Sequence, residues 1–214
     1  MREPGRDCRL CPRLATYRRA NRRHFPEFHN APVPSFGGGD ARLLVVGLAP
    51  GLKGANRTGR PFTGDYAGDL LYATLSKFGF AHGRYGALAT DGLALVAARV
   101  TNAVRCVPPE NKPTPAEVAT CRPFLAAEIA ALPRLKALLA LGTIAHAAVL
   151  ASFGLTPGRH PFAHGAEHAL TPRIRLFDSY HCSRLNTNTG RLTQAMFETV
   201  FARIAAHLAQ GERG

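Results

Sequence analysis

The feature that most constrains the fold is the alternation of short, β-branched apolar runs with segments of helical apolar spacing. Gly and Pro end the first run, ARLLVVGLAP. The predicted strands are 41–50, 95–104, 135–141 and 173–179, and the predicted helices are 69–78, a capped helix after Thr114, 143–153 and 193–208. Strands that alternate with helices pair in parallel and are covered on both faces. We therefore predict an α/β fold, a three-layer α/β/α sandwich around a mainly parallel four-stranded sheet.

A single domain is expected over residues 1–214, with residues 1–40 as an N-terminal arm that ends in PVPSFGGGD. No internal repeat or linker interrupts the patterns, and a hydrophobic content of 46% fits a globular fold. No apolar run approaches the roughly 20 residues of a membrane span, and the first residues lack the apolar core of a secretory signal. We expect a monomer in the bacterial cytoplasm, near the nucleoid, with no membrane partner.

The cysteine spacing predicts a metal centre. Cys8 and Cys11 form a CxxC, and Cys106 and Cys121 follow far downstream with fourteen residues between them. Under reducing conditions such thiols are better candidates for metal ligands than for disulfides. A zinc ribbon would more often carry a second CxxC, so the spacing favours an iron–sulfur cluster held by all four. The alternative is that Cys106 and Cys121 are ordinary buried thiols; Cys182 is predicted to be no ligand.

The chain is strongly basic, with 27 Lys and Arg against 14 Asp and Glu and a net charge of +13. Nearly all of the basic residues are arginines, and eight lie in the first 23 residues: Arg2, Arg6, Arg9, Arg13, Arg18, Arg19, Arg22 and Arg23. Guanidinium groups bind phosphates in pairs of hydrogen bonds and stack on bases. This clustering favours a surface that binds DNA or RNA; the alternative is a solvated tail or a genome-wide arginine bias.

Three polar segments, 47–65, 101–106 and 180–193, follow predicted strands. In parallel sheets the ligand crevice lies beyond the carboxyl ends of the strands, so these segments predict the active site. The Asn102 amide has the donor and acceptor that match the N3–H and O4 edge of uracil, and Phe62 can stack on a flat ring. No GxxxxGK[ST] or GxGxxG motif is present, which argues against phosphate-loop and dinucleotide-binding sites.

The motifs GLAPG with NRTGRPFTGD, TNAVRC, and HCSRLNTNTGRLT resemble those of the uracil-DNA glycosylases of the iron–sulfur branch, and are most similar to family five (the UDGb type). The resemblance extends from Cys8 to about Thr193, with the cysteines and three motifs in the same order. It implies a three-layer α/β/α fold with a parallel sheet. It also implies a structural [4Fe–4S] cluster that holds DNA-contacting loops.

The resemblance assigns roles to individual residues. Phe62 is expected to stack on uracil, Asn102 to bind its edge, and His181 to stabilise the departing base near O2. Asp65 is expected to position or activate the water, with Asp69 as the second choice. An N-cap of the following helix is the alternative role for Asp65. Further substrate contacts are expected from Gly47, Ala49 and Gly51.

The segment 183–192 resembles a loop that enters the minor groove, where Arg184 or Leu185 is expected to fill the space left by the flipped base. The predicted phosphate contacts are Lys53, Arg57, Ser183, Asn188, Thr189 and Arg191. The chain departs from the family at two positions. Leu48 stands where family four carries Glu, and Cys182 stands where relatives carry Pro, which is expected to loosen the backbone beside the catalytic His.

These features predict a monofunctional glycosylase that hydrolyses the N-glycosidic bond of uracil in DNA, leaves an abasic site and serves base excision repair. Hypoxanthine and xanthine are further candidate bases. The alternative, from another class, is a non-catalytic binder of uracil-DNA or abasic sites. A covalent suicide trap is disfavoured because the loop lacks the histidine-bearing insertion of those relatives.

Overall fold

A computed structural model describes residues 3–210. Its main sheet has six strands in the order β1-β5-β2-β6-β8-β7. Four central strands are parallel: β5 (Ala98–Asn102), β2 (Leu43–Gly47), β6 (Ala137–Leu141) and β8 (Arg175–Ser179). They coincide with the four predicted strands. The chain leaves β2 toward β5 on one side and later returns to β6 on the other, which makes the end of β2 a topological switch point.

The predicted sheet of four strands was incomplete. Two edge strands, β1 (Phe36–Gly37) and β7 (Glu167–Ala169), pair antiparallel with β5 and β8. They are two and three residues long, too short to produce a periodic apolar pattern. The parallel core is as predicted, and the edges add a short antiparallel strand on each side.

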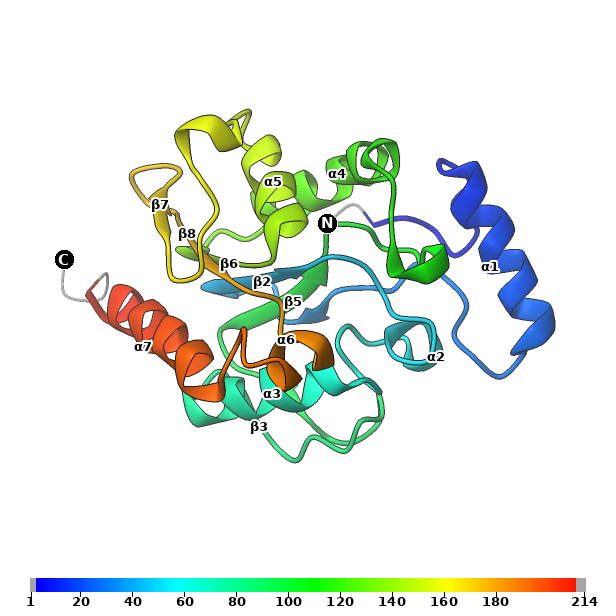
Figure 1. Ribbon diagram of the computed structural model, residues 1–214, viewed down its shortest axis with the longest axis horizontal. Helices are drawn as coiled ribbons and strands as arrows, with labels where there is room; N and C mark the ends of the chain where they lie inside the picture. Colours follow the sequence, from blue (N-terminus) through cyan, green and yellow to red (C-terminus); the bar gives the residue numbers. More distant parts are fainter. Residues whose placement is uncertain (1–2, 211–214) are drawn as a thin grey trace.

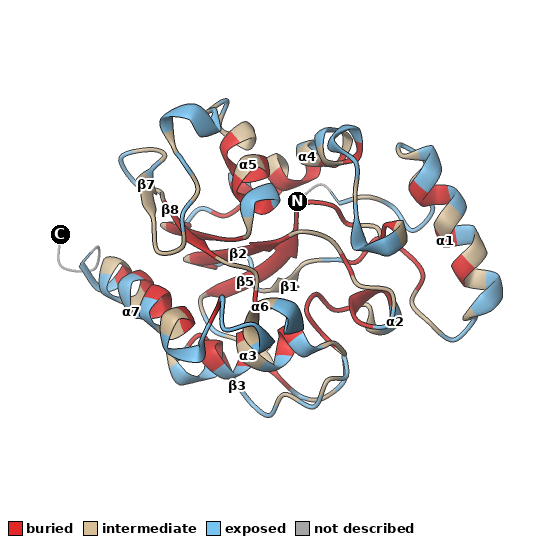
Figure 2. Ribbon diagram, in the orientation of Figure 1, coloured by how far each residue is buried: buried red, intermediate tan, exposed pale blue. Residues whose placement is uncertain are grey.

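Helices cover both faces of the sheet, as the alternation predicted (Figure 1). α3 (Tyr66–Lys77) and α7 (Gln194–Gln210) lie on one face, and α4 (Pro115–Ala130) and α5 (Thr143–Ser152) lie on the other. The side chains of β2 alternate between two hydrophobic cores. Leu43 and Val45 pack on the face covered by α3 and α7, and Leu44 and Val46 pack on the face covered by α4 and α5. Both faces of the central strands are buried (Figure 2), and β2 and β6 are accordingly continuously apolar.

One local expectation is confirmed in detail, and one element of the arm was missed. The helix α4 begins with a capping box, in which the Thr114 hydroxyl accepts from the Glu117 N–H and the Glu117 carboxylate accepts from the Thr114 N–H. The N-terminal arm contains a helix, α1 (Pro12–His24), that was not predicted, because its pattern is dominated by arginines. Leu14 packs from α1 against Val104 and Phe124.

The remaining elements are short. They are α2 (Ala55–Thr58), the hairpin of β3 (Ala81–His82) and β4 (Ala94–Leu95), the 3-10 helices Pro109–Asn111 and Pro157–Arg159, and α6 (Arg184–Asn188). Of the helices in the described part of the chain, none is both long and apolar enough to cross a membrane.

Candidate active site

The three polar segments converge on one cavity of about 440 Å³ beyond the carboxyl ends of β2, β5 and β8. The predicted residues that line it are Ala49, Gly51, Phe62, Asp65, Asn102, His181, Ser183 and Arg184. The sheet register brings two of the segments together, because Gly47 at the end of β2 pairs directly with Asn102 at the end of β5. The cavity therefore lies at the switch point of the sheet.

Gly47 is the residue that lets an aromatic ring and an amide approach the strand end. A Cβ atom at this position would lie 2.4 Å from Phe62 Cζ and 2.5 Å from Asn102 Oδ1. Asn102 is 3% exposed and Phe62 is 6% exposed, so both side chains are held by the surrounding protein. The result is a flat apolar wall beside an amide edge.

Asp65 directly precedes α3 but does not cap it. Its backbone is extended, as at an N-cap, yet its side chain accepts no capping hydrogen bond. Within the described structure, its Oδ1 atom is buried without a hydrogen-bond partner. Burial raises the pKa of this carboxyl above its usual 3.8. The backbone N–H groups of Ala67 and Gly68 in the first turn of α3 oppose this rise, and Asp65 also lines the cavity.

His181 follows β8 and faces Phe62 across the cavity. The two rings are 5.8 Å apart between centroids and inclined by 25°. Burial lowers the pKa of His181 to about 4, so the imidazole is neutral near pH 7. Its backbone carbonyl accepts a 2.8 Å hydrogen bond from the Asn186 amide, which ties it to α6.

The short helix α6 stands at the mouth of the cavity. Ser183 caps it by accepting from the Asn186 N–H, and Leu185 projects into solvent with 72% of its surface exposed. The Arg184 guanidinium lies 5.5 Å from the Tyr66 ring, and that of Arg191 lies 4.6 Å from the Tyr180 ring. Other predicted DNA contacts lie outside the cavity on the exposed surface: Lys53, Arg57, Asn188 and Thr189.

Cys182 is fully buried, and its thiol lies 3.4 Å from the Ala67 carbonyl, to which it donates. Burial raises the pKa of this thiol well above its usual value. The contact joins the segment after β8 to the first turn of α3. Cys182 thus links the segments that carry His181 and Asp65.

Sequence reasoning missed five residues that line the cavity: Leu48, Ala55, Tyr66, Ala67 and Asn111. Asn111 ends the 3-10 helix Pro109–Asn111 and has a left-handed backbone, with φ of 57°. It lies in the Pro-rich segment VPPENKP, just after Cys106. A polar residue with a left-handed backbone in such a loop was the available signal, but its approach to the cavity depends on tertiary structure.

A second cavity is lined by Cys8, Cys11, Cys106 and Cys121, which come from the arm, the segment after β5, and α4. All five cysteines of the chain are free. Of the described residues, no three of these four sulfurs lie within 4.8 Å of one another. Tetrahedral zinc, with Zn–S of about 2.3 Å, would bring them to about 3.8 Å. The described sulfurs are therefore more widely spaced than the ligands of one zinc ion.

The sulfurs lie near positive charge and N–H donors. Arg18 Nη1 donates to Cys106 Sγ and the Arg105 backbone N–H donates to Cys121 Sγ, both at 3.4 Å. Burial raises the pKa of Cys11 to about 11, with Cys121 adding to the shift, and raises that of Cys106 to about 12. Such thiols do not ionise readily on their own, but a bound metal centre would displace their protons. The N–H groups that donate to the sulfurs would stabilise the resulting thiolates, so the four residues fit a metal centre.

A third cluster is formed by His146 of α5, His168 of β7 and Asp178 of β8. His146 Nδ1 is 2.8 Å from Asp178 Oδ1, and its Nε2 is 2.8 Å from the His160 carbonyl. Both ring nitrogens therefore meet acceptors. Burial opposes protonation, but these hydrogen bonds outweigh it and raise the pKa of His146. His168 Nε2 lies 3.2 Å from Asp178 Oδ2, so this cluster is a hydrogen-bonded network.

The sheet order and the cavity define a class: an α/β protein whose cavity lies beside a buried Asn and Phe at the carboxyl ends of its central strands. A family model described as the uracil DNA glycosylase superfamily matches residues 34–205. The chain belongs to this superfamily. Cys8 and Cys11 precede the matched range.

Individual relatives agree with the family. The chain is 48% identical over 195 residues to the type-5 uracil-DNA glycosylase of Thermus thermophilus, an overlap of 89% of each chain. It is 45% identical over 202 residues to the type-5 uracil-DNA glycosylase of Mycobacterium leprae, covering 91% of this chain and 88% of the relative. Similarity to the type-4 uracil-DNA glycosylase of Pyrobaculum aerophilum is lower, 33% over 150 residues, or 70% of this chain and 62% of that one.

Proposed function

We propose that the protein is a uracil-DNA glycosylase that hydrolyses the N-glycosidic bond of uracil in DNA and leaves an abasic site for base excision repair. The observation that carries the proposal is the convergence of Phe62, Asp65, Asn102 and His181 on one cavity. They come from three separate segments, and the chain belongs to the uracil-DNA glycosylase superfamily. The relatives named type-5 uracil-DNA glycosylases support the same activity.

Recognition is assigned to the inner wall of the cavity. A base must leave the helical stack to reach a cavity at the strand ends. The Phe62 ring stacks on the flipped uracil, and the Asn102 amide binds O4 and N3–H. Cytosine reverses the donor and acceptor on this edge, so the same amide rejects it. Gly47 provides the space in which the ring and the amide approach each other, and Ala49 and Gly51 line the same wall.

Bond cleavage places negative charge on the leaving uracil and positive charge on the sugar. The neutral His181 donates a hydrogen bond toward uracil O2, where negative charge develops. The carboxylate of Asp65 positions the attacking water and stabilises the cationic sugar. Asp65 lines the cavity and its Oδ1 atom is buried, whereas Asp69 is exposed and is not a lining residue, which supports this role for Asp65.

DNA contacts are assigned to the rim. Leu185 enters the space that the flipped base leaves in the stack, beside Arg184. Its exposure on a capped helix supports this assignment, because an apolar side chain held in solvent is available for insertion. Phosphate contacts are assigned to Lys53, Arg57, Ser183, Asn188, Thr189 and Arg191.

The residues Cys8, Cys11, Cys106 and Cys121 are assigned as ligands of a [4Fe–4S] cluster, which joins the arm to the segment after β5 and to α4. When bound, the cluster supplies a structural cross-link. Purified protein is expected to show brown iron–sulfur absorbance that is lost in Cys8→Ala and retained in Cys182→Ser. Colourless native protein with intact fold, or colour retained in Cys8→Ala, contradicts the assignment.

The range of bases extends in this proposal to hypoxanthine and xanthine, and the working unit is a monomer with one domain over residues 1–214. A panel of duplexes that carry uracil, hypoxanthine, xanthine or a thymine mismatch measures the range. Size-exclusion chromatography with light scattering measures the mass against 23.0 kDa.

The decisive test incubates the protein with a uracil-containing oligonucleotide. Strand cleavage is expected only after alkali, because a glycosylase without lyase activity leaves the backbone intact. Asn102→Ala is expected to lose excision; retained activity would contradict its recognition role. Tight binding of uracil-DNA without turnover by the unaltered protein would instead support a non-catalytic binder.

A further inference from the structure

The turn that carries Phe62 has an unusual backbone. Phe62 has a φ of 52°, in the left-handed region that L side chains rarely adopt. Such a conformation costs free energy and persists only where neighbouring groups over-determine it. The contacts around residues 60–64 therefore show what holds the ring in place.

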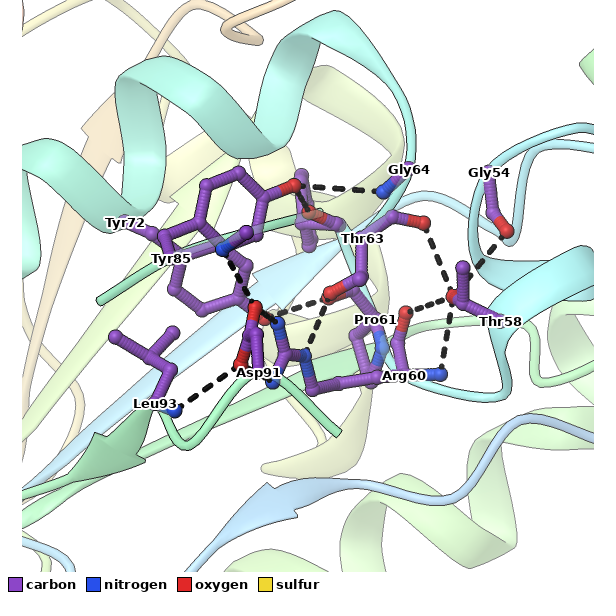
Figure 3. Close-up of polar contacts among 12 residues, drawn as sticks. Gly54, Thr58, Arg60, Pro61, Thr63, Gly64, Tyr72, Tyr85, Asp91 and Leu93 are labelled. Carbon is purple, nitrogen blue, oxygen red and sulfur yellow. Dashed lines mark hydrogen bonds and ion pairs between the residues drawn. The ribbon is translucent and has the colours of Figure 1, made fainter. Parts of the chain in front are cut away.

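A buried ion pair holds the first residue of the turn. Arg60 Nη1 and Nη2 bind Asp91 Oδ1 and Oδ2 at 2.8 and 2.6 Å, and both side chains are 5% exposed (Figure 3). Arg60 Nε also donates to Thr63 Oγ1 at 2.8 Å, which bridges across Phe62. Three rings surround the guanidinium at 4.9 to 5.8 Å from their centroids: Phe36, Tyr72 and Tyr85.

Hydroxyl groups hold the carbonyls of the turn. Tyr72 donates to the Pro61 carbonyl at 2.6 Å, Tyr85 to the Phe62 carbonyl at 3.2 Å, and Thr58 to the Thr63 carbonyl at 3.0 Å. The donors come from α3, from the loop before β4 and from α2, so three elements fix three successive carbonyls (Figure 3). The backbone of the turn has little freedom left.

We propose that Arg60, Asp91, Tyr72 and Tyr85 form a clamp whose function is to position Phe62 for stacking on the flipped base. The proposal rests on the proposed function. It assigns a site role to the loop 83–93, which lies outside the recognition motifs. The clamp residues touch no substrate, so they are positioning residues. Without the clamp, the Phe62 backbone relaxes out of the left-handed region and the ring leaves its place beside Gly47.

A double-mutant cycle tests this role. Asp91→Asn, Phe62→Ala and the double variant are assayed for single-turnover excision of uracil from a duplex, for inhibition by free uracil, and for binding to undamaged duplex. Asp91→Asn is expected to slow excision at least tenfold and to weaken inhibition by uracil. Binding to undamaged duplex should stay within twofold. In the Phe62→Ala background, Asp91→Asn should lower the excision rate less than twofold, because the clamp acts only through the Phe62 ring.

Controls separate positioning from loss of fold. Glu198→Gln breaks the ion pair with Lys77 at the far end of α3 and should leave excision unchanged. If Asp91→Asn yields no folded protein, Tyr85→Phe takes its place in the double-mutant cycle, because it removes one hydroxyl group from the clamp. Equal losses in both backgrounds, an unchanged rate in the single variant, or weakened binding to undamaged duplex would overturn the clamp. Absence of excision by the unaltered protein would instead overturn the proposed function.

Discussion

Asp65 and His181 face the same cavity, and burial moves their pKa values in opposite directions. The pKa of the carboxyl rises and that of the imidazole falls to about 4, because burial disfavours the charged form of each. The histidine is therefore neutral near pH 7, and in the proposed function we expect ionisation of the carboxyl to set the acid limit of activity. The proposed chemistry needs these two states at the same pH.

Asp65→Asn is expected to slow single-turnover excision by about 10²–10⁴-fold, the typical contribution of a positioned base. Binding to uracil-DNA should persist, since the side chain keeps its shape. In the unaltered protein the rate should rise with pH through a pKa above 3.8, because the active form is the carboxylate. Asp69→Asn serves as the control, and an equal loss in that variant would reassign the role to Asp69.

His146 predicts a pH dependence of stability. Its folded-state pKa lies above the usual 6.5, so its contribution is fully present below pH 6.5 and is lost as pH rises through the folded value. His181, with a lowered pKa, acts oppositely and only between about pH 4 and 6.5. The free energy of unfolding should therefore fall above pH 6.5, and His146→Gln should lose this slope. The control is His82→Gln, which changes an exposed histidine and should keep the dependence of the unfolding free energy on pH. If this dependence persists in His146→Gln and is lost in His82→Gln, the assignment to His146 is wrong.

At the scale of elements, the site depends on the register of β2 and β5. Their pairing places Gly47 opposite Asn102, so the Asn102 amide and the space for the Phe62 ring come from one pair of residues. Strand ends buried on both faces hold these positions more rigidly than free loops would. The chemistry of the site is thus fixed largely by the packing of two strands.

Gly47→Ala tests that dependence. The added methyl would lie 2.4 Å from Phe62 and must displace the ring or the Asn102 amide. Excision is expected to fall more than tenfold, with binding to undamaged duplex retained. Gly39→Ala is the matched control, because a Cβ there meets no atom within 4 Å. A Gly47→Ala protein of unchanged rate would show that the ring and the amide are not held against the strand.

The central strands and the helices that cover the sheet were predictable because continuous apolar runs and helical spacing are strong local signals. The strands β1 and β7 could not be predicted, because two or three residues are too few to show an alternating pattern. The helix α1 could not be predicted, because most of its residues are polar. The motifs identified Phe62 and Asn102. They could not identify Asn111 or Asp91, whose positions depend on how distant loops pack.

At the scale of the whole molecule, the cysteine cavity joins parts that are distant in sequence. The arm contributes Cys8 and Cys11, while Cys106 follows β5 four residues after Asn102. Several arginines of the arm are engaged internally: Arg13 with Glu117, Arg18 with Cys106, and Arg22 with Asp7. The arm is therefore a packed part of the fold, and only part of its positive charge is free for DNA.

Cys121→Ser is expected to lower the melting temperature and to expose the arm to protease, because the proposed cluster is the link between α4 and the arm. Limited proteolysis followed by mass spectrometry should find cleavage before residue 34 in the variant only. Cys182→Ser, which changes a buried thiol outside this cavity, should leave the arm protected. Equal protection in Cys121→Ser would show that packing of Leu14 suffices to hold the arm.

The order of the site residues along the chain has a consequence for biosynthesis. Residues near the N-terminus leave the ribosome first, yet His181 follows β8, the last strand of the sheet, and α7 comes later still. Parallel pairing of β8 with β6 also waits for contacts between distant residues. A nascent chain thus holds Phe62 and Asn102 long before it holds His181. In the proposed function, excision therefore waits until β8 and the segment that follows it have been made and packed.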